Sequence, residues 1–177
     1  PCKHLRMVID FHTHIFPDKI AHKTIDYLSK KGGIPPFSDG TLSGLMGTSN
    51  RINLRIALPV LTNPASFESV NRFAHEINEA NAEEGDIISF GAIHPRCDDI
   101  DEKMKFLKKQ GFKGVKIHPD YQDTYINDEG YVKIMESARE YDMTVITHAG
   151  LDVAYLENVH CPPSLALALI KKVPHKK

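Results

Sequence analysis

Two closely spaced histidines near the start of the chain are the first residues that could do chemistry. The segment Met7–His14 reads MVIDFHTH, in which a short apolar run leads into Asp10, His12 and His14. Side chains on a strand alternate between its faces, so residues two apart share a face. Two imidazoles on one face suit a divalent metal ion, and Zn²⁺ accepts both nitrogen and oxygen ligands. Taken alone, the pair favours solvated histidines at a polar strand end.

Histidine also follows three later segments that the hydrophobic pattern predicts to be strands. These three residues are His94, His118 and His148. The carboxyl ends of parallel strands lie on one face of a barrel, where the active site is found. Any one of them is better explained as an ordinary histidine with a hydrogen-bond partner, but chance would scatter the whole set over helices as well. We therefore expect these residues to converge with the first pair on one face of the sheet, where a metal ion could bind.

The elements that must position these histidines are strands alternating with helices. After the first at 7–9, strands are expected over 52–60, 87–93, 113–117 and 144–147, and helices over 17–30, 66–84, 98–110, 128–141 and 164–172. This order predicts an α/β protein with a parallel sheet, either a TIM barrel or a doubly wound open sheet. No G-x-G-x-x-G follows the first strand, so a dinucleotide-binding fold has no support.

Composition excludes several classes of partner. The 177 residues are 41% hydrophobic and 25% charged, with a net charge of −1. This near-neutral balance gives no electrostatic argument for binding nucleic acid or an anionic membrane. No apolar run approaches the ~20 residues that span a bilayer. We therefore expect a small-molecule substrate rather than a nucleic acid or a membrane.

The first residues and the cysteines bear on domain organisation and compartment. Residues 1–6 lack the apolar core of a secretory signal and precede Met7, so we expect them to be extraneous or disordered and 7–177 to form a single domain. Cys2, Cys97 and Cys161 are an odd number, widely spaced and without a C-x-x-C motif. This favours a reducing, cytoplasmic environment over a disulfide framework.

Lys116 shares a strand face with His118, and in a closed barrel that face points to the axis. We rank three roles for it: contact with substrate or water first, an amine that snorkels to the barrel mouth second, and carboxylation to a bridging metal ligand third. For Asp10 we give equal weight to two roles, orienting a ligand histidine and making a structural hydrogen bond.

The residues that follow His118 are expected to form a loop on the same face of the barrel. We assign Asp120, Tyr121 and Gln122 to this loop rather than to catalysis. His160 precedes Cys161 and a proline pair, and we place it at the mouth of the site.

Three motifs in order give the chain a family resemblance. They are H-x-H after the first strand, GVKIHP at 114–119 and VITHAG at 145–150. With these motifs the chain resembles the amidohydrolase superfamily. It is most similar to the amidohydrolase-related branch (amidohydrolase 2), which includes metal-dependent hydrolases and decarboxylases of the aminocarboxymuconate-semialdehyde type. The resemblance runs from about Met7 to the end and implies a TIM-barrel-type (β/α) fold.

The resemblance also implies roles for individual residues. His12 and His14 match the first-strand metal pair, and His148 matches the metal ligand of the fifth strand. His94 and His118 sit where such proteins line the substrate pocket. The implied cofactor is a divalent ion, Zn²⁺ first and Mn²⁺ second, which activates a water to attack a small-molecule substrate. In the family an aspartate after the eighth strand takes the proton, and a histidine after the sixth stabilises the developing charge.

The chain departs from the family in length, because it holds five of the eight βα units. A whole barrel takes about 250 residues. The general-base aspartate and the sixth-strand histidine are therefore expected beyond Lys177, the catalytic residues stay unassigned, and Asp152 and Asp10 are weak substitutes. The first and last strands would keep unpaired edges, which invite association of copies into a homo-oligomer.

Three hypotheses follow for the function. The first is a metal-dependent amidohydrolase-type hydrolase or decarboxylase. The second is a TatD-like nuclease or a PHP-type phosphoesterase, since both also begin with a strand-end H-x-H. TatD-like chains place a glutamate ligand at the third strand, whereas the segment Ser89–His94 contains none. The third is a non-catalytic remnant that binds metal weakly or not at all, which the missing last third favours.

Overall fold

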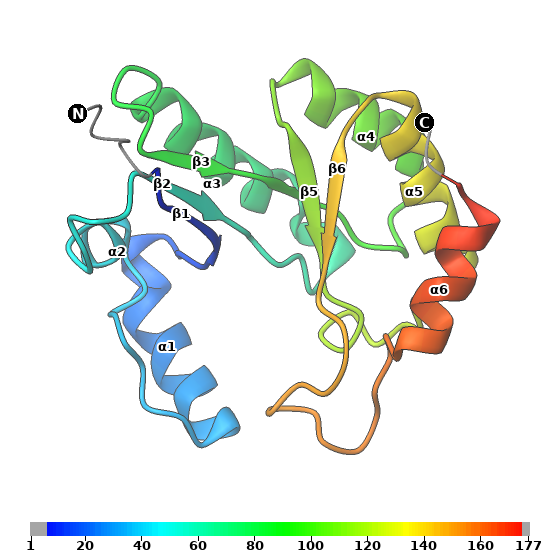
Figure 1. Cartoon of the computed structure of the whole chain (residues 1–177), viewed down its shortest axis with the longest axis horizontal. Coiled ribbons are helices and arrows are strands. Elements are labelled where there is room, and N and C mark those ends of the chain that lie inside the picture. The colour runs from blue at the N-terminus through cyan, green and yellow to red at the C-terminus, as the bar shows by residue number, and fades with distance from the viewer. Residues whose placement is uncertain (1–6, 175–177) are drawn as a thin grey trace, which may run out of the picture.

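Parallel strands with helices packed against them form the fold. The computed structural model describes residues 7–174 (Figure 1). One sheet consists of β1 (Ile9–Thr13), β2 (Leu54–Ala57) and β3 (Ile87–Ser89), and a second consists of β4 (Gly91–Ala92), β5 (Gly114–Ile117) and β6 (Thr144–Thr147). Every strand pair is parallel, and Phe90 alone separates β3 from β4 in the chain. The predicted α/β class with a parallel sheet is confirmed.

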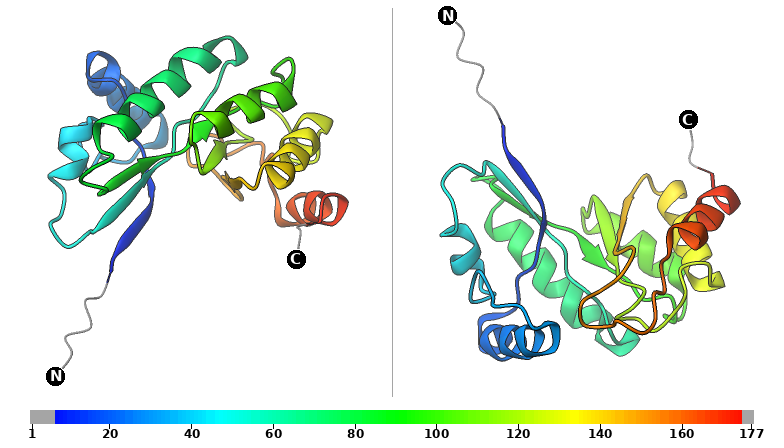
Figure 2. Two further views of the ribbon diagram at one scale, coloured as in Figure 1. Left: turned by 90° about the horizontal axis from the view of Figure 1, so that it is seen from above. Right: turned by 60° about the horizontal axis from the view of Figure 1, so that its bottom comes forward.

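The helices follow the strands in the order that the sequence predicts. They are α1 (Asp18–Gly32), α2 (Leu42–Met46), the short 3-10 helix η1 (Pro64–Ser66), α3 (Phe67–Ala80), α4 (Ile100–Lys109), α5 (Glu129–Glu140) and α6 (Pro163–Lys172). Figure 2 shows α3, α4 and α5 on one side of the strands, which leaves the other side open. The described residues therefore form five βα units of a TIM-barrel-type fold, with no closed barrel among them.

The predicted strand over 87–93 divides into β3 and β4, and two side-chain amides of α3 hold the two halves. Asn78 accepts from the Ser89 N–H at 2.7 Å and donates to the Ser89 carbonyl at 2.9 Å. Asn71 does the same for Ala92, at 2.8 Å and 2.9 Å. Side-chain amides thus satisfy backbone groups that neighbouring strands leave free, and the bend at Phe90 is stabilised.

Local chemistry sets where several helices begin and end. Asp128 is the N-cap of α5, and its carboxylate accepts from the Gly130 N–H at 2.9 Å. Gly33 ends α1 at a φ of 66°, a left-handed conformation that glycine adopts without a steric penalty. Asp99 stands at the N-cap of α4, as predicted, but its φ is 49° and its side chain makes no capping hydrogen bond.

The largest core cluster packs α4 and α5 against the sheet of β4, β5 and β6. It includes Val115 and Ile117 of β5 with Met104, Leu107 and Ile134, each at most 1% exposed. Burying about 100 Å² of such a side chain contributes roughly 2.5 kcal/mol. This packing fixes β5, and with it the direction in which the end of the strand presents its polar residues.

Strands β1 and β6 lie at the ends of the two sheets. Within residues 7–174, β1 pairs with β2 alone and β6 pairs with β5 alone. Val8, Ile9 and Phe11 are exposed beside the β1 edge, at 44%, 41% and 51%. Both edges therefore keep free backbone groups next to apolar surface.

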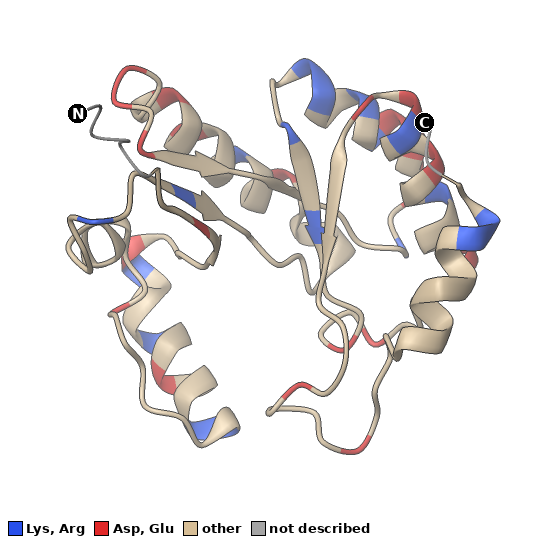
Figure 3. Cartoon of the chain, viewed as in Figure 1, with Lys and Arg blue, Asp and Glu red and all other residues tan. Residues whose placement is uncertain are grey.

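Charges are mixed over the surface of the molecule. Figure 3 shows basic and acidic segments interspersed along α4 and α5, and acidic segments in the loops after β5 and β6. In the part of the chain that the structure describes, no helix has the length and apolar character that a membrane span requires.

Candidate active site

The pair His12 and His14 lies at the end of β1, with the two rings side by side. Their centroids are 5.1 Å apart. Thr13 between them is buried and its hydroxyl donates to the Ile56 carbonyl at 2.9 Å, so the histidines project to the opposite side. The Nδ1 of His14 lies 2.8 Å from the Leu58 carbonyl oxygen. In a neutral ring Nδ1 must then carry the proton, which leaves the lone pair of Nε2 free to bind a metal ion.

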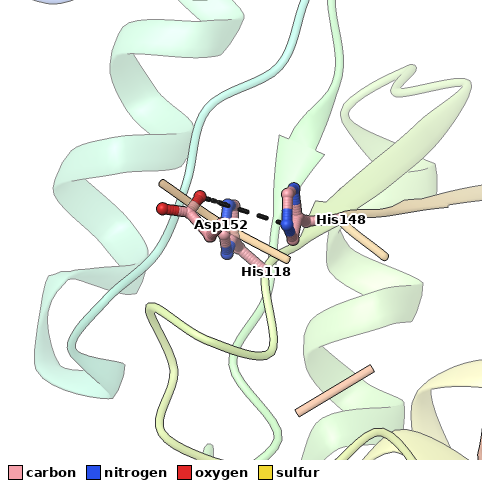
Figure 4. A group of neighbouring side chains, drawn as sticks. All are labelled: His118, His148 and Asp152. Atoms are coloured by element: carbon pink, nitrogen blue, oxygen red, sulfur yellow. Dashed lines mark ion pairs between the residues drawn. The ribbon is translucent and has the colours of Figure 1, made fainter. Parts of the chain in front are cut away.

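A second group gathers at the ends of β5 and β6. His118 and His148 stack with their centroids 4.3 Å apart and their planes at 5°. Asp152 Oδ2 lies 3.5 Å from the Nε2 of His118 and 4.0 Å from the Nε2 of His148 (Figure 4). One potential ligand atom from each of the three residues falls within 4.8 Å of the others. This is the tightest arrangement of potential metal ligands that residues 7–174 contain.

Lys116 is fully buried on the same face of β5, two residues before His118. Its Nζ has no hydrogen-bond partner among the described residues. Burial lowers the pKa of Lys116 to about 8, because desolvation disfavours the charged amine. A buried ammonium without a partner is costly, so this position favours an anionic ligand. The predicted snorkelling of the amine to solvent is absent from the structure.

Burial and neighbouring side chains lower the pKa of three of the site histidines and keep their imidazoles neutral. Burial lowers the pKa of His118 to about 3, with smaller contributions from His148 and Lys116. The pKa of His14 falls to about 4, because surrounding protein desolvates the ring and His12 lies beside it. Desolvation also lowers the pKa of His12, and the charges of Lys116 and His148 add to it. The structure thus brings these predicted site residues within electrostatic reach of one another, in the neutral form that binds metals.

His94 also follows a strand and is buried, but its ring is hydrogen-bonded within its own loop. It lies beyond β4, and its Nδ1 accepts from the Arg96 N–H at 3.0 Å. Burial and then Arg96 lower its pKa to about 4. The hydrogen bond that fixes the ring of His94 thus comes from its own loop rather than from another site residue.

Two aspartates that sequence reasoning gave little weight belong to the site. Asp120 is fully buried in its side chain, and its Oδ1 accepts from the His160 N–H at 2.9 Å and pairs with His160 Nδ1 at 2.9 Å. Its Oδ2 lies 3.6 Å from His148 Nε2. The spacing carries the signal that could have found them, because Asp120 follows His118 by two residues and Asp152 follows His148 by four.

Comparison with protein-family models shows which family the chain belongs to. The model described as amidohydrolase matches residues 9–172, nearly the whole of the described chain. The chain belongs to the amidohydrolase family. No curated protein matches it at a comparable level of significance.

Solved structures share the fold of this chain. The apo IDCase of Metarhizium anisopliae is 16% identical, with a TM-score of 0.58, and the match covers 82% of this chain and 52% of that one. A structure named as an amidohydrolase II is 16% identical, with a TM-score of 0.59, and the match covers 86% of this chain and 53% of that one. A 5-carboxyvanillate decarboxylase of Novosphingobium aromaticivorans with bound manganese is 16% identical, with a TM-score of 0.51. That match covers 94% of this chain and 56% of the decarboxylase. This amidohydrolase therefore spans about half the length of these structures.

The residues of this amidohydrolase fit a divalent metal ion. The Nε2 of His148 is buried and has no hydrogen-bond partner in residues 7–174, so this ring nitrogen is available to a ligand. The Nε2 of His14 is free for the tautomeric reason given above. For His118 the reverse holds, because its Nδ1 accepts from the Tyr121 N–H at 3.4 Å and Nε2 then carries the proton toward Asp152. Imidazole nitrogens and carboxylate oxygens suit Zn²⁺ and Mn²⁺ alike.

Proposed function

We propose that this chain carries the metal-binding and carboxylate-binding part of an enzyme that hydrolyses or decarboxylates a small-molecule substrate. The observation that supports it is the grouping of neutral imidazoles from β1, β5 and β6 around the buried ammonium of Lys116. The decarboxylases among the similar structures favour a carboxylate substrate. Membership of the amidohydrolase family supports the metal-dependent class.

His12, His14 and His148 would hold the metal in this proposal. The free Nε2 lone pair of His14 and the unpartnered Nε2 of His148 support their assignment, and the ring of His12 lies beside that of His14. These ligands suit both Zn²⁺ and Mn²⁺, so the experiment below tests both ions. When bound, such an ion supplies Lewis acidity and lowers the pKa of a coordinated water.

Lys116 and His118 would bind the substrate, and His94 would line the pocket behind them. The ammonium of Lys116 is the buried positive charge that a substrate carboxylate would pair with. The proton on His118 Nε2 points toward Asp152 and is available to an oxygen of the substrate. A substrate with one carboxylate would thus be oriented by a charge from β5 and a hydrogen bond from the adjacent loop.

The pair His118 and Asp152 would handle the proton. Decarboxylation breaks a carbon–carbon bond, releases CO₂ and leaves an electron pair on carbon that must take up a proton. In hydrolysis the attacking water loses a proton instead. The Nε2 of His118 and the Oδ2 of Asp152, 3.5 Å apart, are positioned to hold that proton in either case.

The test uses purified protein loaded with Zn²⁺ or Mn²⁺. A panel of small aromatic and unsaturated carboxylates is followed for CO₂ release, and matching amides and esters are followed for cleavage. We expect His118→Gln to lose about 100-fold or more in turnover, because a proton-transfer group contributes 10²–10⁴-fold. His22→Gln, on the exposed face of α1, is the control. Metal retention with no turnover of either kind would contradict the enzyme proposal.

A second candidate function is metal binding without turnover. It is supported by the length relationship, since the chain spans 52% to 56% of the solved structures that it matches. Under this alternative the histidines would still bind Zn²⁺ or Mn²⁺. The same assay separates the two candidates, because only the first gives CO₂ or a cleaved product.

A further inference from the structure

The side-chain amide of Gln122 is buried at the centre of the loops that surround the site. Gln122 is 1% exposed, and every hydrogen-bonding position of its amide is used. Its Nε2 donates to the Leu61 carbonyl at 2.9 Å and to the Ile93 carbonyl at 2.8 Å. Its Oε1 accepts from the His118 N–H at 3.1 Å and from the Tyr131 hydroxyl at 2.8 Å. One side chain thus connects three loops and helix α5.

Each of the three loops either contains a site histidine or contacts one. Leu61 lies in the segment after β2, three residues beyond Leu58, whose carbonyl orients the ring of His14. Ile93 immediately precedes His94, and the third connection is to the backbone of His118 itself. The amide therefore sets the spacing between the strand ends on which these histidines stand.

We propose that Gln122 is a positioning residue, which holds the loops after β2, β4 and β5 in the arrangement that brings the site imidazoles together. A merely structural role would be served by any buried amide with satisfied hydrogen bonds. What distinguishes Gln122 is that one partner is the backbone of His118, while two others lie in the loop that contacts His14 and in the loop that contains His94. This inference rests on the metal site proposed above, and it adds to that proposal the residue that organises the site.

Asn71 provides a matched comparison within the same chain. It is 2% exposed and its amide also joins separate elements, since it donates to the Phe67 and Ala92 carbonyls and accepts from the Ala92 N–H. Ala92 lies two residues before His94, but none of the partners of Asn71 lies in the loop that carries His118 or in the loop that contacts His14. Replacing either amide by an acid places an oxygen against two carbonyl oxygens, so the two substitutions disturb the fold by the same chemistry.

The experiment measures Zn²⁺ affinity by chelator competition and the histidine Cε1–H signals by NMR, the latter without metal. Gln122→Glu is compared with Asn71→Asp. We expect Gln122→Glu to bind Zn²⁺ at least tenfold more weakly and to shift the signals of His94 and His118. We expect Asn71→Asp to stay within twofold of the Zn²⁺ affinity of the unaltered protein and to leave the His118 signal in place. Tyr131→Phe removes one of the four hydrogen bonds, and it serves if Gln122→Glu does not fold; we expect a smaller loss of affinity and a shift of the His118 signal.

The outcomes separate this inference from the function on which it rests. Equal losses of Zn²⁺ affinity in Gln122→Glu and Asn71→Asp would overturn the positioning role, and so would unchanged histidine signals in both Gln122→Glu and Tyr131→Phe. If the unaltered protein binds no Zn²⁺ or Mn²⁺, the metal site is refuted. The histidine signals recorded without metal then still decide whether Gln122 positions the rings.

Discussion

The rings of His118 and His148 lie parallel, with their planes at 5° and their centroids 4.3 Å apart. They come from the ends of adjacent strands, β5 and β6, whose register pairs Ile117 with Thr147. The register therefore places the two imidazoles in contact. Because the rings support one another by stacking, a ring can be replaced by another aromatic ring to separate packing from metal binding.

His148→Phe is expected to keep the stack and lose the nitrogen ligand. We predict a loss of at least tenfold in Zn²⁺ affinity, about 1.4 kcal/mol or more. The midpoint of thermal unfolding without metal should change little. His75→Phe is the control, since His75 lies on α3 beside Phe112 and pairs with Glu79. Isothermal titration with Zn²⁺ measures the effect, and equal affinities for all three proteins would count against His148 as a ligand.

Lys116→Met is expected to separate binding from stability. Methionine fills most of the space of the lysine stem without burying a charge, so the free energy of unfolding should stay equal or rise by about 1 kcal/mol. Binding of a simple carboxylate such as benzoate to the metal-loaded protein should weaken at least tenfold. Lys113→Met, at an exposed position just before β5, should leave both quantities unchanged. Benzoate titration and urea unfolding are the two measurements, and undiminished benzoate binding would refute the anion-binding role.

Asp101 is expected to make stability depend on pH in the acid range. It joins α4 to α5, accepting from Ser137 Oγ at 2.7 Å and from the Tyr141 hydroxyl at 2.8 Å. These hydrogen bonds hold the pKa of Asp101 below its usual value of 3.8. A carboxylate whose folded-state pKa is depressed contributes stability above its unfolded pKa, and that stability is lost as the pH falls through the folded-state value.

Asp101→Asn should therefore lower the free energy of unfolding at pH 7 by about 1 kcal/mol, the scale of a hydrogen bond to an exposed charge. The difference between the two proteins should shrink as the pH is lowered from about 4 toward 2. Urea unfolding at several pH values measures it. Asp98→Asn, at an exposed neighbouring position, should show no such trend. A constant difference across the acid range would mean that ionisation of Asp101 is not the cause.

The free edge of β1 is expected to drive association between copies of the chain. Ile9 is 41% exposed on this edge strand, next to backbone groups that have no strand partner within residues 7–174. A lysine at an edge opposes strand pairing, so Ile9→Lys should weaken self-association at least tenfold. Val153→Lys, in an exposed loop, should not. Sedimentation velocity over a range of concentrations measures the effect, and a monomer at every concentration would show that the edge is inert.

Much of the fold and part of the site could be predicted from the sequence. The expected strand over 144–147 coincides with β6, and the expected helix over 128–141 contains α5 with its cap at Asp128. These succeed because hydrophobic period and capping chemistry are local properties of the chain. The prediction of a single strand over 87–93 was wrong in part. The side chains that bind the backbone on either side of Phe90 come from a separate element, α3, and strand periodicity does not report them.

The sequence by itself determined which residues stand at strand ends, and therefore that His12, His14, His118 and His148 could meet. Tertiary structure alone decided the rest. It showed that Lys116 is sealed from solvent, that Asp120 and Asp152 turn back toward the histidines, and that Gln122 connects the loops. The physical reason is that burial, tautomer and hydrogen-bond partner depend on atoms from other elements. Strand periodicity reports only the direction of a side chain, not what it meets there.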